Sequence, residues 1–221
     1  MEYQLVHSKR KTIAICVNRD GSVTVRAPMR AAQSMIDRFV REKQEWITEK
    51  STQMAANAAV RKNFDVTAGS TLSLLGQDYP VVQGESVTFT GSRFTIPNED
   101  FETLKPKLIA LYKILAQQII PERTAHFSKQ TALSPNNVRI GSANTYWGCC
   151  SGKNNLNFSY KLIMAEPEVI DYVIVHELSH TVEHNHSARF WKLVQGILPD
   201  YKERRAKLRL LEKKLQKQGW S

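Results

Sequence analysis

Two histidines four residues apart, at the end of an apolar run, constrain this chain more than any other feature of its sequence. The run at residues 169–175 leads directly into His176, Glu177 and His180. Side chains at helix positions i and i+4 project from the same side, so both imidazoles can reach one metal ion at about 2.0–2.1 Å. Glu177 lies about 100° around the helix from His176, where its carboxylate can contact a water on the metal without binding the metal itself. The pattern predicts a metal-binding helix with an acid–base residue beside the ligands.

A third ligand should come from the same segment, because four of the six histidines lie within residues 176–186. In an unbroken helix, Glu183 and His184 would lie roughly 5–6 Å beyond His180 along the axis, too far to share the ion comfortably. Asn185 tolerates the left-handed backbone conformation that ends helices, and a turn there would bring His186 back toward the metal. We therefore predict that His186 is the third ligand, with His184 as the alternative.

Two other interpretations of the histidine cluster have to be weighed. The histidines could belong to an ordinary helix, or they could form a structural zinc site in which Glu177 has no catalytic role. Structural zinc sites prefer four closely spaced cysteine and histidine ligands, and Cys149 and Cys150 do not have that spacing. Glu203, on the next predicted helix, is a weaker candidate for the third ligand.

Composition and charge limit the class of protein. The 221 residues are 42% hydrophobic and 24% charged, which is typical of a globular protein rather than a disordered or fibrous one. No window approaches the roughly 18 apolar residues that a membrane span needs, and the N-terminal residues lack a signal-peptide core. Three cysteines form no disulfide framework. We therefore expect a cytoplasmic protein with no membrane partner.

The net charge of +10 favours polyanionic partners. The excess lies largely in residues 9–30 and in residues 202–217, where eight basic residues face only two acidic ones. A solvated helix face explains the C-terminal run, but a basic N-terminal hairpin and a basic C-terminal helix would also suit nucleic acid. No motif for reading a base or a groove accompanies them.

Hydrophobic periodicity predicts an α+β fold. Residues 12–27 alternate around a turn at residues 18–21, which indicates a hairpin, and residues 31–62 have the spacing of one long amphipathic helix that includes Met35 and Trp46 in its apolar stripe. Residues 64–97 indicate several short strands. We expect a first region, residues 1–98, of hairpin, long helix and small sheet.

The second expected region, residues 99–221, is mostly helical and could form one compact unit with the first. Residues 101–131 predict a helix that Pro121 should kink or split. Residues 137–141 and 155–162 predict strands that flank a glycine-rich loop, and Pro167 should begin the metal-binding helix. Further breaks are expected near Asn185 and at Pro199.

Several segments together resemble the YgjP-like metallopeptidase domain family, whose wider relatives are the SprT-like and WLM zinc metallopeptidases. The likeness covers nearly the whole chain. It is carried by Trp147-Gly148-Cys149-Cys150-Ser151, by residues 167–180, by Asn185-His186-Ser187-Ala188-Arg189-Phe190-Trp191 and by Leu198-Pro199-Asp200-Tyr201-Lys202.

The resemblance implies a zincin-like metallohydrolase domain with zinc on His176, His180 and His186 and with Glu177 as the base. Family members commonly carry Thr-Arg-Trp-Gly-Ser-Cys-Ser before the zinc helix. This chain departs from that pattern at two positions, Tyr146 and Cys149. The departures concern the substrate preference and not the metal chemistry.

The predicted function is zinc-dependent hydrolysis, most simply of a peptide or protein, with another divalent cation as an alternative to Zn²⁺. A metal lowers the pKa of a bound water toward about 7, and Glu177 would take its proton. An extended peptide could add to the strand at residues 155–160, and Tyr146 or Tyr160 could stabilise the oxyanion.

Two alternatives have a different substrate or partner. The first is a pyrophosphohydrolase that acts on a nucleoside triphosphate, since a metal-activated water can also attack a phosphoanhydride and cationic side chains bind phosphate. The second is a zinc protease associated with nucleic acid. Steep salt dependence of binding would favour the nucleic-acid-associated protease over the peptidase and the pyrophosphohydrolase.

Overall fold

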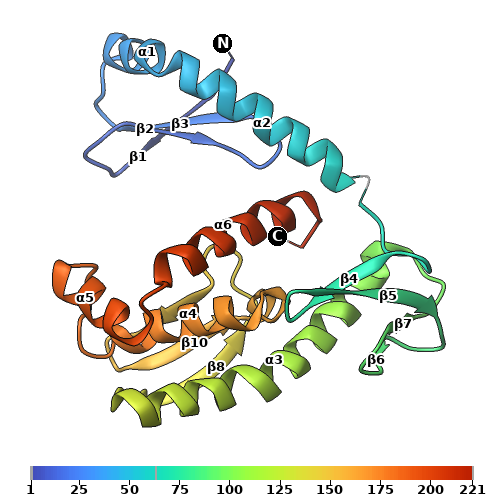
Figure 1. Cartoon of the computed structure of the whole chain (residues 1–221). Helices are drawn as coiled ribbons and strands as arrows, with labels where there is room; N and C mark the ends of the chain where they lie inside the picture. Colours follow the sequence, from blue (N-terminus) through green and yellow to red (C-terminus); the bar gives the residue numbers. More distant parts are fainter. Residues whose placement is uncertain (1, 63, 221) are drawn as a thin grey trace. The chain divides into compact units, whose positions relative to one another are not determined.

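The structure is a computed structural model that describes residues 2–62 and 64–220. The chain divides into two compact units, residues 1–64 with 214–221 and residues 65–213. The described residues form six α-helices and three small sheets (Figure 1). The α+β class predicted from the sequence is therefore confirmed.

The first unit contains a three-stranded sheet in the order β1-β3-β2. Strands β2 (Ala14–Val17) and β3 (Val23–Pro28) form the antiparallel hairpin that the alternating pattern predicted. Strand β1 (Gln4–Ser8) runs parallel to β3 and was not predicted. Its five residues show no alternation strong enough to separate a strand from a loop.

Two helices cover this sheet where one was expected. Helix α1 (Gln33–Glu42) is followed by Lys43, and the φ of −105° and ψ of 9° of this residue separate α1 from α2 (Gln44–Lys62). The core consists of Val23, Val25, Ala27, Ile36, Val40 and Ile47. Because Ile36 and Ile47 fill this core, the neighbouring Met35 and Trp46 remain exposed, and their assignment to the buried stripe is wrong.

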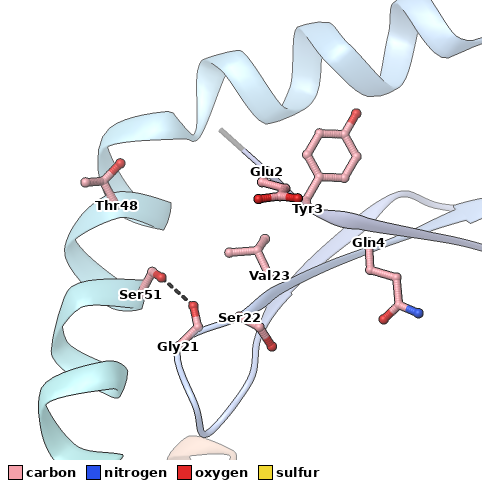
Figure 2. A pocket seen from close by; sticks show the side chains of 8 residues that line it. All are labelled: Glu2, Tyr3, Gln4, Gly21, Ser22, Val23, Thr48 and Ser51. Carbon is pink, nitrogen blue, oxygen red and sulfur yellow. Dashed lines mark hydrogen bonds between the residues drawn. The ribbon is translucent and has the colours of Figure 1, made fainter.

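The hairpin turn approaches α2 too closely for a side chain. Gly21 has a φ of +90°, and a Cβ there would lie 2.9 Å from both the Ser51 carbonyl oxygen and the Ala55 Cβ. The Ser51 hydroxyl donates a hydrogen bond to the Gly21 carbonyl (Figure 2). Both the backbone conformation and the space therefore require glycine. Beside this contact lies an open hollow of about 600 Å³.

The short strands expected at residues 64–97 form a sheet in the order β4-β5-β7-β6. They are β4 (Thr71–Leu74), β5 (Gln77–Gln83), β6 (Thr88–Phe89) and β7 (Phe94–Ile96). The amide of Leu75 donates to the Ile163 carbonyl at 2.8 Å, and the Tyr112 hydroxyl donates to the Ser73 carbonyl at 2.9 Å. These bonds place the sheet in the second unit, so the expected boundary near residue 98 does not coincide with the division of contacts.

The third sheet has the order β8-β10-β9. Strand β10 (Asn155–Ser159) pairs parallel with β8 (Asn137–Gly141) and antiparallel with β9 (Gly148–Cys150), and the 3-10 helix η1 (Tyr160–Met164) follows it. The expectation that residues 155–160 offer a free edge is wrong, because both sides of β10 are paired. Strand β9 lies in the segment that was predicted as a glycine-rich loop, and it forms an edge of this sheet.

Helix α3 (Phe101–Thr131) is the longest element and lies in the second unit (Figure 1). The Asp100 side chain caps it by accepting from the Thr103 amide at 3.0 Å. The expected split at Pro121 does not occur. Proline removes only one backbone donor, and Ile120 and Thr124 are buried on either side of it, in a stripe that keeps one face of the helix packed.

Three helices complete the chain. Pro167 begins α4 (Pro167–Ser179) as predicted, and α5 (Ala188–Ile197) and α6 (Tyr201–Lys217) follow it. Ten of the thirteen residues of α4 are buried, so this helix lies in the core of the second unit. Among the described residues, no helix is both long enough and apolar enough to cross a bilayer.

An ion pair connects α4 to α3. Asp171 accepts from the Arg123 guanidinium through both carboxylate oxygens, each at 2.6 Å, and its side chain is 12% exposed. Paired, charge-assisted hydrogen bonds of this kind are stronger than bonds between neutral groups. The ion pair therefore neutralises the acidic side chain that α4 buries against α3.

Asp171→Asn should lower the free energy of unfolding by about 2 kcal/mol, because it weakens both bonds and leaves a partly buried guanidinium without its counter-charge. The matched control is Glu99→Gln, which removes one negative charge from the more exposed pair with Lys107 and should cost less than about 1 kcal/mol. Urea unfolding followed by circular dichroism measures both. Equal losses in the two variants would contradict this account.

Candidate metal centre

The end of α4 positions the first two histidines. His176 lies in the last turn, and His180 is the C-cap residue, with helical φ and ψ of −70° and −11°. The side chains therefore keep the i, i+4 relation that places them on one side of the helix. The helix ends at Ser179, earlier than expected, and the backbone turns directly after the second histidine.

His186 returns from the loop between α4 and α5. Asn185 does not adopt the left-handed conformation that we expected. Its side-chain oxygen instead accepts from the Ser187 amide at 3.1 Å, and the Ser187 hydroxyl caps α5 by accepting from the Phe190 amide at 3.3 Å. Two consecutive side-chain caps thus fix the backbone on the C-terminal side of His186.

The structure brings together the three histidines that the sequence singled out. The Nε2 atom of His186 lies 3.0 Å from Nε2 of His176 and 3.2 Å from Nε2 of His180. Within the described residues, these three form a group whose ligand atoms all lie within 4.8 Å of one another. Ligand nitrogens about 2.0–2.1 Å from one tetrahedral ion would lie roughly 3.3 Å apart, so the spacing suits a shared cation.

Hydrogen bonding and ring packing orient the imidazoles. Nδ1 of His180 lies 2.9 Å from the Glu183 carbonyl, which can only accept, so Nδ1 carries the proton and Nε2 presents its lone pair. Phe190 stacks on His180 with ring centroids 4.4 Å apart, and Trp191 stacks on His186 at 5.7 Å. Nδ1 of His176 is buried without a hydrogen-bond partner among the described residues, and the rings of Tyr172 and Phe190 pack against this imidazole.

The same packing favours the neutral form of two of these imidazoles, those of His176 and His180. Burial, with additional repulsion from His180, His186 and Arg205, lowers the pKa of His176 to about 3. Burial also lowers the pKa of His180. Neutral imidazole is the form that binds metals, so the site is ready for a cation at neutral pH.

Glu177 lies under strand β9. Its side chain is almost fully buried, and that burial raises the pKa of its carboxyl group to about 8. A Cβ on Gly148 would lie 2.6 Å from Cγ of Glu177 and 2.9 Å from its Oε1. The carboxylate therefore occupies space that any residue except glycine would fill.

Comparison with known proteins identifies the chain. The model of the YgjP-like metallopeptidase domain matches residues 11–210. The chain belongs to this family. A metallopeptidase domain implies a metal cofactor and a peptide or protein substrate. The expected family is confirmed.

A solved structure also shows similarity. It is the crystal structure of the metallopeptidase zymogen of Pyrococcus abyssi abylysin, with 22% sequence identity and a TM-score of 0.38. The match covers 41% of this chain and 91% of the other. No curated protein matches the chain.

Other residues singled out from the sequence do not belong to the three-histidine group in this YgjP-like domain. His184 is exposed, and Glu183 contributes its carbonyl rather than its carboxylate. Tyr160 is 2% exposed and lies in the core, where burial raises its pKa to about 12, so it is not available to an oxyanion. Tyr146 is 40% exposed, and its hydroxyl accepts from the Asn157 amide at 3.2 Å.

Sequence reasoning missed two residues beside the site. Gly148 was noted only as part of a family motif, although a glycine within a strand can mark a close approach. Tyr172, one turn before His176, packs its ring 5.9 Å from that imidazole. The i, i+4 spacing from His176 was the signal that could have found Tyr172.

Gly148→Ala should reduce peptide hydrolysis by about tenfold to a hundredfold while metal binding is retained, because the new methyl group displaces Glu177 and not the histidines. Gly152→Ala, in the turn after β9, is the control, since a Cβ there meets no atom within 4 Å. Metal content by elemental analysis and the rate of peptide cleavage check both variants. Full activity in Gly148→Ala would show that the position of Glu177 does not matter.

Proposed function

We propose that this YgjP-like domain is a zinc-dependent peptidase in which His176, His180 and His186 hold the ion and Glu177 is the general base. The observation that carries the proposal is the convergence of three histidine Nε2 atoms: that of His186 lies 3.0 Å from that of His176 and 3.2 Å from that of His180. Glu177, whose side chain is buried, directly follows His176 in the sequence. Three protein ligands with one open position are typical of catalytic zinc sites.

The donor set supports zinc without excluding other cations. Three neutral imidazoles suit Zn²⁺, and they also suit other divalent transition metals. His176 and His180 are half-buried, whereas His186 is exposed, so the group faces solvent on one side. A substrate can approach from that side.

The residues of the chain divide the chemistry between them. A bound divalent cation supplies Lewis-acid activation of water. A carboxylate oxygen of Glu177 accepts the proton of the attacking water and later donates it to the leaving amine nitrogen. A cation held by the three histidines would favour the ionised form of Glu177, which is the form that acts as a base, whereas burial favours the protonated form. The dry surroundings strengthen each electrostatic interaction.

Strand β9 provides an edge for the substrate. It pairs with β10 on one side only, so its other side can accept an extended peptide as an added strand. Gly148 of this strand borders Glu177. A peptide aligned on β9 would therefore pass close to the base.

The alternatives gain no support from the described residues. A nucleoside triphosphate as the substrate and nucleic acid as the partner both rested on the basic stretches. In α6, Arg204 pairs with Asp200 at 2.9 Å, and Lys207 pairs with Glu168 at 2.9 Å, so part of the C-terminal charge is neutralised. The cytoplasmic location stays a prediction.

Replacing each proposed ligand by alanine should reduce bound zinc from about one equivalent to a small fraction, because two imidazoles hold an ion much less tightly than three. His184→Ala is the matched control, since it removes an exposed histidine of the same segment and should leave the metal in place. Elemental analysis after dialysis measures the stoichiometry. Loss of zinc in His184→Ala with retention in His186→Ala would reverse the assignment of the third ligand.

Glu177→Gln should keep the zinc and lower the rate of peptide cleavage by at least about a hundredfold, because the amide cannot accept the proton. The substrates are casein-derived peptides and, in parallel, each nucleoside triphosphate. Turnover of a triphosphate alone by the wild-type protein would favour the phosphoanhydride reaction. An active Glu177→Gln variant would exclude Glu177 as the base.

A further inference from the structure

A hollow of about 350 Å³ is lined by residues from α5 to the first half of α6 and includes Trp191, which packs against the candidate metal centre. All of its lining residues belong to the second unit. The lining consists of Trp191, Tyr201, Lys202, Arg205, Ala206 and Arg209. It combines two aromatic rings with three cationic side chains and contains no acidic residue.

The aromatic wall of this hollow is continuous with the metal centre. Trp191 and Tyr201 are stacked, with ring centroids 5.3 Å apart and an interplanar angle of 20°. Trp191 also stacks on His186, with centroids 5.7 Å apart and an angle of 23°. Trp191 therefore belongs both to the wall of the hollow and to the packing around a proposed metal ligand.

The five cations in the first half of α6 fall into two classes. Arg204 and Lys207 have carboxylate partners, namely Asp200 for the first and Glu166 and Glu168 for the second. No carboxylate partner is found among the described residues for the three cations of the hollow. The helical spacing explains the separation, because residues 202, 205 and 209 share one side of the helix.

Arg205 connects this charge to the metal centre. Its guanidinium lies 5.3 Å from the ring centroid of Trp191, a cation–π contact that holds it over the aromatic wall. Trp191 in turn packs against the imidazoles of His176 and His186, with ring centroids 5.8 and 5.7 Å apart. The charge therefore acts where the substrate would bind.

We propose that this hollow is a substrate subsite that binds an acidic side chain of the peptide, close to the bond that is cleaved. The inference rests on the proposed peptidase function and adds a preference for one class of sequence. Guanidinium groups form paired hydrogen bonds with carboxylate and with phosphate, so aspartate, glutamate or a phosphorylated serine could supply the anionic group. The aromatic wall packs against the aliphatic part of that side chain.

The test compares three peptides that differ at one position near the cleavage site, with glutamate, phosphoserine or glutamine. The zinc-loaded wild-type protein should cleave the anionic peptides with a KM roughly tenfold lower than that of the glutamine peptide. Arg205→Gln/Arg209→Gln should abolish this difference and leave the glutamine peptide within about twofold of wild type. The better of the two anionic peptides identifies the group that is recognised.

Lys129→Gln/Lys213→Gln is the matched control, since it removes two exposed positive charges outside the hollow. It should keep the preference, which would show that the effect is local and not one of net charge. Lys202→Gln gives an independent variant of the hollow and should weaken the preference in part. Circular dichroism confirms that each variant is folded.

Equal KM values for the anionic and neutral peptides in wild type would overturn the subsite, and so would equal losses for all three peptides in the double variant. An effect of the double variant on triphosphate hydrolysis alone would also overturn it. Calorimetric titration of Glu177→Gln with the same peptides separates the two proposals. Selective binding of the anionic peptides without any cleavage by wild type would support the subsite and contradict the peptidase function.

Discussion

The burial of α4 is the constraint on which the candidate metal centre depends. Each of its large apolar side chains contributes about 1.5–3 kcal/mol when removed from water, so the helix has little freedom to rotate or shift within the second unit. The ion pair of Asp171 with Arg123 neutralises the charged side chain that α4 packs against α3. His176 and His180 thus leave the core in one direction, and the rest of the site forms around that direction.

The same burial places Glu177, the proposed base, in a dry environment. Its carboxylate lies beneath Gly148, where the absent side chain leaves just enough space for it. Burial alone favours the protonated form, whereas the neighbouring cation that the three histidines can hold would favour the ionised one. The opposition of these two effects is a familiar way to bring a catalytic carboxyl group near the operating pH.

Helix α5 packs against both the three histidines and the cationic hollow. Phe190 and Trp191 pack on the imidazoles, and Trp191 also forms one wall of the cationic hollow with Tyr201 and Arg205. One short helix, α5, therefore supports the ligand group on one side and the proposed subsite on the other. Its position depends on the capped turn after His186, so the geometry of the ligands and of the hollow are set together.

The sequence by itself determined the features that depend on local periodicity: the α+β class, the hairpin, the start of α4 at Pro167 and the pairing of His176 with His180. It also predicted His186 as the third ligand, but the reason given, a left-handed backbone conformation at Asn185, is wrong. Tertiary structure decided the rest: the pairing of β10 on both sides, the edge position of β9, the space of Gly148 over Glu177 and the hollow beside Trp191. These features join residues far apart in the chain, and their geometry follows from packing and strand pairing, which no local pattern records.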